Sequence, residues 1–157
     1  MTEAQAAAGG YSVDDRSTAA SGQQIVGTAG ADWIIGSEFG DVISGRAGGD
    51  LICARGGVDV VHGNWGPDEI YGGDKRDIIR GGPGNDVIYG ESGWDRLFGG
   101  PGADMLDGGA GRDLLRGGPG RDVLTGGPGA DVLGGGAGID HCLDATGVDL
   151  VRSCRRG

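Results

Sequence analysis

The sequence predicts an all-β fold in which short parallel strands are stacked coil upon coil into a solenoid. Three observations support this prediction. A nine-residue period runs without insertion from Gly27 to Arg152, an aspartate holds the sixth place of all fourteen repeats, and an aliphatic residue holds the eighth place of all but one. A repeat of this size cannot bury a hydrophobic face alone, so neighbouring repeats stack to form a continuous core.

The composition excludes several other classes of protein. Of 157 residues, 39 are glycine, and they lack the strict triplet spacing of collagen. The net charge of -10 argues against nucleic acid or an anionic membrane surface as the main partner. No run of apolar residues is long enough to span a membrane.

The last three residues of each repeat have the pattern of a short strand. Side chains alternate along a strand, so the eighth residue points inward while the seventh and ninth point outward. Residues 24–26 have the same form and add a fifteenth strand before the first repeat. The expected core is Ile25, Ile34, Ile43, Ile52, Val61, Ile70, Ile79, Ile88, Leu97, Leu106, Leu115, Leu124, Leu133, Cys142 and Val151.

The first six residues of each repeat reverse the chain. Glycine allows positive φ and aspartate closes local turns. Two repeats then make one flattened coil of eighteen residues, and fourteen repeats make about seven coils. We expect a flexible leader over 1–23, the solenoid over 24–152 and a short tail or cap over 153–157.

The aspartate column predicts a cation site. Stacking places the aspartates of repeats n and n+2 a few ångströms apart, where like charges repel. The available ligands are carboxylates and the carbonyl oxygens of glycine-rich turns, a hard oxygen set that suits calcium. Two histidines and three unclustered cysteines give little support to zinc or copper.

The repeats match the pattern GGxGxDxUx, and the chain resembles the RTX (repeats-in-toxin), hemolysin-type calcium-binding nonapeptide repeat proteins over four-fifths of its length. The resemblance implies a right-handed parallel β-roll in which each interior aspartate bridges two successive calcium ions. Two stacks of seven loops allow at most twelve sandwiched sites. The expected ligands are the carboxylates of Asp32, Asp50, Asp68, Asp86, Asp104, Asp122, Asp140, Asp95, Asp113, Asp131 and Asp149, and the carbonyl groups of Gly82, Gly84, Gly100, Gly102, Gly109, Gly111, Gly118, Gly120, Gly127, Gly129, Gly136 and Gly138.

The even-numbered repeats depart from the pattern. Phe39 and Lys75 replace the fourth-place glycine, and Ala54 and Asp144 replace the first-place glycine. We therefore expect the odd stack to be fully occupied and the even stack to be weak or empty before Asp95. The candidates for weaker metal sites are Asp41, Asp59 and Asp77.

The cysteines lie mostly near the C-terminal end. A disulfide between Cys142 and Cys154 would staple the last coil, which has no further neighbour. We interpret Cys53, at an outward place, as a free thiol rather than a metal ligand.

The outward places of the odd-numbered strands form an apolar odd-strand face. It could dock a protein partner or the N-terminal arm, although strand propensity alone explains its composition better. Its residues are Trp33, Ile35, Leu51, Tyr71, Val87, Tyr89, Met105 and Val123.

The expected function is calcium binding by a secreted bacterial protein whose folding depends on the ion. The alternatives are a calcium-dependent adhesive or surface-structural module, which would self-associate or bind a protein partner through the odd-strand face, and the non-catalytic tail of a secreted hydrolase or toxin. We expect no enzyme activity, because neither His62 nor His141 is accompanied by a catalytic motif and the glycine-rich turns lack the GK[ST] of a phosphate loop.

Overall fold

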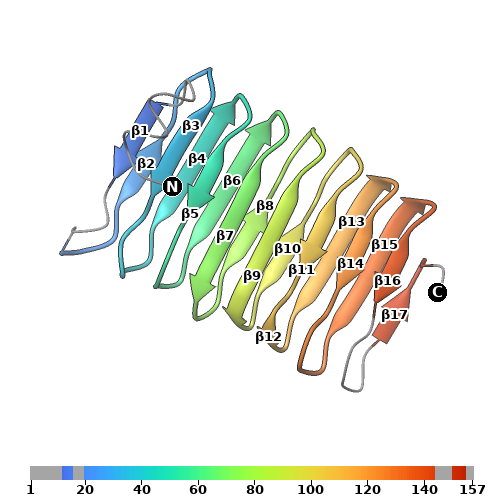
Figure 1. Cartoon of the computed structure of the whole chain (residues 1–157). Helices are drawn as coiled ribbons and strands as arrows, with labels where there is room; N and C mark the ends of the chain where they lie inside the picture. The colour runs from blue at the N-terminus through green and yellow to red at the C-terminus, as the bar shows by residue number, and fades with distance from the viewer. Residues whose placement is uncertain (1–11, 16–19, 144–149, 155–157) are drawn as a thin grey trace.

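Two parallel sheets face each other across a thin core. The computed structural model describes residues 12–15, 20–143 and 150–154, and within them the chain forms strands and turns but no helix. Figure 1 shows the strands following one another along an elongated roll, with the N-terminal coils at one end and the C-terminal coils at the other. The prediction of a β-solenoid with about seven turns is confirmed.

The strands of the odd-numbered repeats, with one strand from the N-terminal segment and one from the turn of repeat ten, build a nine-stranded sheet. Its order along the roll is β1-β3-β5-β7-β9-β11-β14-β16, and β12 pairs with β9. Its strands are β1 (Ser12–Asp15), β3 (Asp32–Ile35), β5 (Leu51–Cys53), β7 (Glu69–Asp74), β9 (Val87–Gly93), β11 (Met105–Asp107), β12 (Ala110–Gly111), β14 (Val123–Thr125) and β16 (His141–Leu143).

The even-numbered repeats build an eight-stranded sheet of order β17-β15-β13-β10-β8-β6-β4-β2. Its strands are β2 (Gln24–Val26), β4 (Val42–Ala47), β6 (Val60–Trp65), β8 (Ile78–Arg80), β10 (Arg96–Phe98), β13 (Leu114–Gly120), β15 (Val132–Gly138) and β17 (Leu150–Arg152).

The register between neighbouring strands follows the repeat. Ile34 pairs with Ile52 and Leu97 with Leu115, a shift of eighteen residues in both sheets. Repeat n therefore lies on repeat n+2, as the period predicts. The strand β1 was not predicted; it lies in the segment expected as a leader and pairs with β3 at a shift of twenty residues, Ser12 opposite Asp32.

The eighth-place residues form the core. Every one from Ile25 to Leu133 is fully buried, Cys142 is 6% exposed, and Val151 packs against them at the C-terminal end. Ala54 adds a buried methyl group to this ladder. The inward residues predicted from the alternation are thus confirmed.

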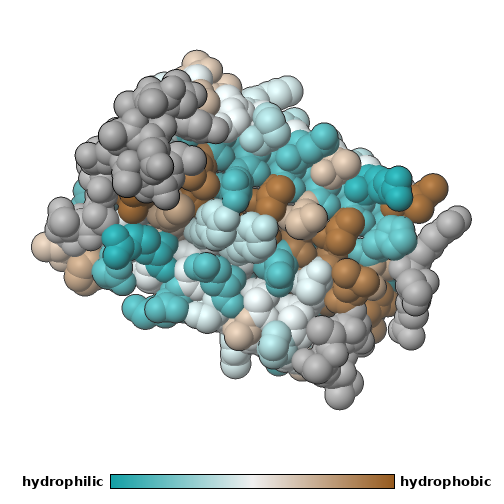
Figure 2. Space-filling model, in the orientation of Figure 1, coloured by the Kyte–Doolittle hydropathy of each residue, from teal (hydrophilic) through white to brown (hydrophobic). Residues whose placement is uncertain are grey.

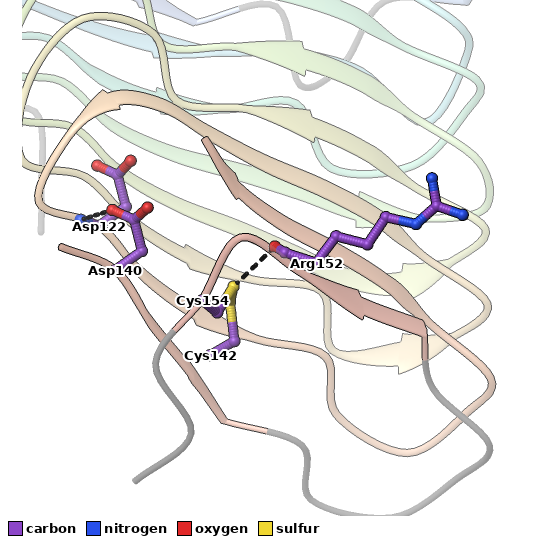
Figure 3. Close-up of a disulfide and its surroundings, with 5 residues drawn as sticks. All are labelled: Asp122, Asp140, Cys142, Arg152 and Cys154. Atoms are coloured by element: carbon purple, nitrogen blue, oxygen red, sulfur yellow. Dashed lines mark hydrogen bonds between the residues drawn. A yellow bond between two sulfur atoms is a disulfide. The ribbon is translucent and has the colours of Figure 1, made fainter. Parts of the chain in front are cut away.

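A disulfide joins the last coil to the tail. Figure 3 shows the disulfide between Cys142 and Cys154, whose Cα atoms lie 5.7 Å apart. The Cys154 Sγ lies 3.2 Å from the carbonyl oxygen of Arg152. The proposed pairing is confirmed, and Cys53 is a free, half-buried thiol.

The odd-strand face combines stacked rings with exposed side chains. Tyr71 and Tyr89 stack with ring centroids 4.9 Å apart. Trp33 is only 7% exposed although its place points outward, whereas Met105 is 47% exposed. On the face seen in Figure 2, hydrophobic side chains lie scattered among hydrophilic ones.

Candidate metal centre

The sixth-place aspartates stand at the junction between each turn and the strand that follows. All thirteen of them from Asp32 to Asp140 are at most 2% exposed, so each stack buries a column of carboxylates beside the core. Asp149, the fourteenth, lies outside the described residues. Acidic side chains are almost never buried without a partner, so this column requires a compensating interaction.

From Asp50 to Asp140, one oxygen of each carboxylate links two coils. The backbone N–H of Asp86 donates to Oδ1 of Asp104 over 2.9 Å, and the N–H of Asp104 donates to Oδ1 of Asp122 over the same distance. The same bond recurs in both stacks in eleven pairs, from Asp32–Asp50 to Asp122–Asp140, at 2.6 to 3.0 Å. Sequence reasoning missed this role, because it treated neighbouring aspartates only as repelling charges.

The second oxygen is left without a donor. Among the described residues, no hydrogen-bond donor reaches the buried Oδ2 of Asp50, Asp59, Asp68, Asp77, Asp86, Asp95, Asp104, Asp113, Asp122 or Asp140. An unsatisfied buried acceptor costs about 1–3 kcal/mol, and a charged one more. These oxygens therefore fit a site that receives a cation rather than a hydrogen-bond donor.

Backbone carbonyl oxygens face the same space. A carbon atom attached at Gly99, a first-place glycine, would lie 2.3 Å from Asp104 Oδ2 and 2.7 Å from the carbonyl oxygen of Gly117 in the next coil. Carboxylate and carbonyl oxygens thus converge where the glycine leaves room. Hard oxygen donors of this kind are the ligands that calcium prefers.

The second place of the turn requires a left-handed backbone. From the third repeat to the thirteenth, the second place has positive φ, for example 119° at Gly100. Arg46, Arg55, Asn64 and Glu91 adopt the same conformation without being glycine, at φ between 71° and 82°. The backbone path of the turn is therefore kept even where the sequence departs from the glycine pattern.

The fourth place is limited by the neighbouring coil. A carbon atom attached at Gly102 would lie 1.5 Å from the carbonyl oxygen of Gly84. Fourth-place carbonyl groups of successive coils thus stack directly along the loop edge. This close approach explains why twelve of fourteen fourth places are glycine.

The even stack keeps the geometry of the odd stack even where its sequence departs from the repeat pattern. Lys75 occupies its fourth place with φ of 81°, and the N–H of Asp59 donates to Oδ1 of Asp77 over 2.8 Å. Ala54 is fully buried at a first place, where twelve of the fourteen repeats carry glycine. Weak or absent ion binding before Asp95 stays a prediction.

Burial raises the pKa of the stacked carboxyl groups. It raises the pKa of Asp59, Asp86 and Asp95 from 3.8 to about 7, with backbone hydrogen bonds opposing the shift and neighbouring aspartates adding to it. The same causes raise the pKa of a second set of four to about 6, namely Asp68, Asp77, Asp104 and Asp113. The pKa of Asp50 and of Asp122 is also raised, burial being the largest cause. In the calcium-free roll near neutral pH, burial therefore opposes ionisation of these aspartate carboxyl groups.

Two further features are absent from the described part of the chain. No group of three or more His, Cys, Asp and Glu side chains gathers there. The same residues include no helix long and apolar enough to cross a membrane.

Comparison with known families bears on the same residues. The family model described as the RTX calcium-binding nonapeptide repeat (4 copies) matches residues 26–61, 35–70, 62–93, 71–106 and 107–142. No curated protein matches the chain.

Proposed function

Because the chain belongs to the RTX calcium-binding nonapeptide repeat family, which implies calcium binding, we propose that it is a secreted β-roll that folds when calcium fills the turns between its coils. The observation that carries the proposal is the set of buried Oδ2 oxygens that no described donor reaches, on the ten aspartates named above. A bound ion supplies divalent positive charge between stacked carboxylates.

The residues that would hold the ions are the sixth-place aspartates and the carbonyl groups of the turns. Asp Oδ1 already links coil to coil, which leaves Oδ2 and the neighbouring carbonyl oxygens for the cation. The glycines keep this space open, since a side-chain carbon at the first place would enter it. Each interior aspartate borders two intervals, and the chain has at most twelve intervals.

Folding and ion binding are coupled in this proposal. The unfolded chain keeps its carboxylates in water, whereas the roll buries them at 0 to 2% exposure. Their raised pKa values express the cost of that burial at neutral pH. Because the ion binds only the assembled turns, its binding free energy becomes folding free energy.

The disulfide supports an extracellular location. Disulfides persist in oxidising compartments and are rare in the cytosol. The Cys142–Cys154 bond fits a protein exported from a bacterial cell, where scarce calcium leaves the chain unfolded, into a calcium-rich exterior. A β-roll made only of calcium-binding repeats is typically non-catalytic, and we propose no catalytic residue.

Circular dichroism of the full chain with calcium and with a chelator tests the proposal. We expect a β-sheet spectrum in calcium and a largely unfolded spectrum in chelator at pH 7.5. Magnesium serves as the control, because it prefers a rigid octahedral shell that keeps several waters. Identical folded spectra in calcium and in chelator would contradict the coupling.

A further inference from the structure

The first coil closes its two turns with its own side chains. Thr28 donates its backbone N–H to Asp32 Oδ2 over 2.6 Å, and its hydroxyl lies 3.1 Å from Oδ1 and 3.2 Å from Oδ2. Ser37 repeats the arrangement with Asp41, through its N–H at 2.7 Å from Oδ2 and its hydroxyl at 3.1 Å from the same oxygen. The carboxylate oxygen that lacks a donor in later coils therefore has donors here.

The hydroxyl groups also accept hydrogen bonds from the backbone of the same turn. The N–H of Gly30 donates to Thr28 Oγ1 over 3.2 Å, and the N–H of Phe39 donates to Ser37 Oγ over 3.2 Å. Each hydroxyl thus accepts from the fourth place and donates to the sixth-place carboxylate. The turn is closed without an added ligand.

The backbone of these two turns differs from that of the later ones. Thr28 and Ser37 are absent from the residues with positive φ, whereas the second place is left-handed from Arg46 onward. In a later turn the second-place N–H points to the next coil, as when Gly82 donates to the carbonyl oxygen of Gly99 over 2.8 Å. In the first coil the same N–H turns back to its own aspartate.

We propose that Thr28 and Ser37 take, in the first coil, the part that calcium takes in the later coils, so that the roll begins with a calcium-independent cap. This inference rests on the proposed function. It assigns no ion to the Asp32–Asp50 and Asp41–Asp59 intervals, which lowers the maximum from twelve sites to ten.

Contacts between the first two even-stack turns agree with this assignment. Arg55 of the second coil forms an ion pair with Glu38 of the first at 2.8 Å. The N–H of Gly56 donates to the carbonyl oxygen of Ser37 over 3.2 Å. A side-chain cation and a backbone bond thus join these turns directly.

Counting bound calcium in the full chain tests the assignment. The first-coil pair is a double variant that carries Asp32→Asn and Asp41→Asn. The interior pair is a double variant that carries Asp86→Asn and Asp95→Asn. The interior pair is expected to lose at least two ions at saturating calcium, because each of its aspartates borders two intervals. The first-coil pair is expected to bind as many ions as the wild type. An equal loss in both pairs overturns the inference.

Hydrogen exchange tests the hydroxyl groups themselves. In calcium-saturated protein, Thr28→Val with Ser37→Ala should speed amide exchange in residues 27–44 by about fivefold for each lost hydrogen bond. The control is Thr125→Val, which removes a half-buried hydroxyl from strand β14. Exchange in residues 27–44 that is unchanged in the double variant, or equally fast in the control, overturns the inference.

The failure of the proposed function would look different. A wild-type chain that binds no calcium refutes the proposed function, whereas a chain that binds calcium but loses ions in the first-coil pair refutes only the cap.

Discussion

Replacing Asp104 by asparagine removes one charge from the middle of the odd stack without changing the shape of the side chain. Asp104 is 2% exposed, and its Oδ1 accepts the N–H of Asp86 over 2.9 Å. The asparagine carbonyl oxygen can keep that bond. What is lost is the negative charge at Oδ2, the oxygen that has no donor among the described residues.

The magnitude follows from the two intervals that Asp104 borders, one toward Asp86 and one toward Asp122. At calcium one hundred times above the dissociation constant, each ion contributes about 2.7 kcal/mol, so losing both lowers the free energy of unfolding by up to about 5 kcal/mol. In calcium-free protein the sign reverses, because replacing a buried, unsatisfied carboxylate by a neutral amide is favourable by about 1–3 kcal/mol.

The assay is urea unfolding in saturating calcium together with a calcium titration of the folding transition, both followed by circular dichroism. The matched control is Asp107→Asn in the same repeat, at a half-buried outward place where Oδ1 accepts the N–H of Gly109 over 3.1 Å. The control should shift the unfolding free energy by less than about 0.5 kcal/mol. The reasoning is refuted if Asp104→Asn leaves the calcium midpoint unchanged, or if the control loses as much stability.

Three further predictions concern the glycines of the turns, the pH dependence of folding and the disulfide. Gly99→Ala should destabilise the calcium-loaded roll by about 1–3 kcal/mol in a urea titration, because its methyl carbon would lie 2.3 Å from Asp104 Oδ2. The control Gly134→Ala should be neutral in the same titration, because the nearest atom lies 3.9 Å from the added carbon. Equal effects of the two variants would contradict this account. Lowering the pH from 8 to 5 in chelator should increase the folded fraction seen by circular dichroism, because carboxyl groups whose pKa is raised from 3.8 to about 6 or 7 keep their protons only in the roll. Across the same range, the calcium concentration that half-fills the sites of the folded roll should rise, since protons compete with the ion for the same oxygens, and a pH-independent binding midpoint would be evidence against ligation by these groups. Reducing the Cys142–Cys154 bond should cost about 3 kcal/mol and lower the melting temperature in calcium, and an unchanged melting temperature would show that the tail adds no stability.

Much of the fold could be predicted because its contacts repeat with the sequence. All fifteen strands expected from the nine-residue period are present, and the shift of eighteen residues between neighbours follows from two repeats per coil. The inward aliphatic residues and the buried aspartate column follow from alternation along each strand. Because the period is strict, every coil packs against its neighbours in the same way, and one repeat predicts the others.

The roles of individual atoms depended on stacking. The period places aspartates next to each other, but it does not say that a backbone N–H holds one oxygen of each while the other lacks a donor. The left-handed backbone at Arg46 and Lys75 likewise departs from what those residue types favour, because the neighbouring coils dictate the path.

The sequence by itself determined the repeat, the strands, the core and the column of carboxylates, since these depend on residue type and spacing alone. Only the tertiary structure decided which aspartates are already satisfied. Thr28 and Ser37 are the two second-place residues that carry a hydroxyl group, and its effect appears only when the turn brings that group within 3.2 Å of a carboxylate. Hydrogen bonds depend on distances of a few tenths of an ångström, and those distances are set when the coils pack against one another.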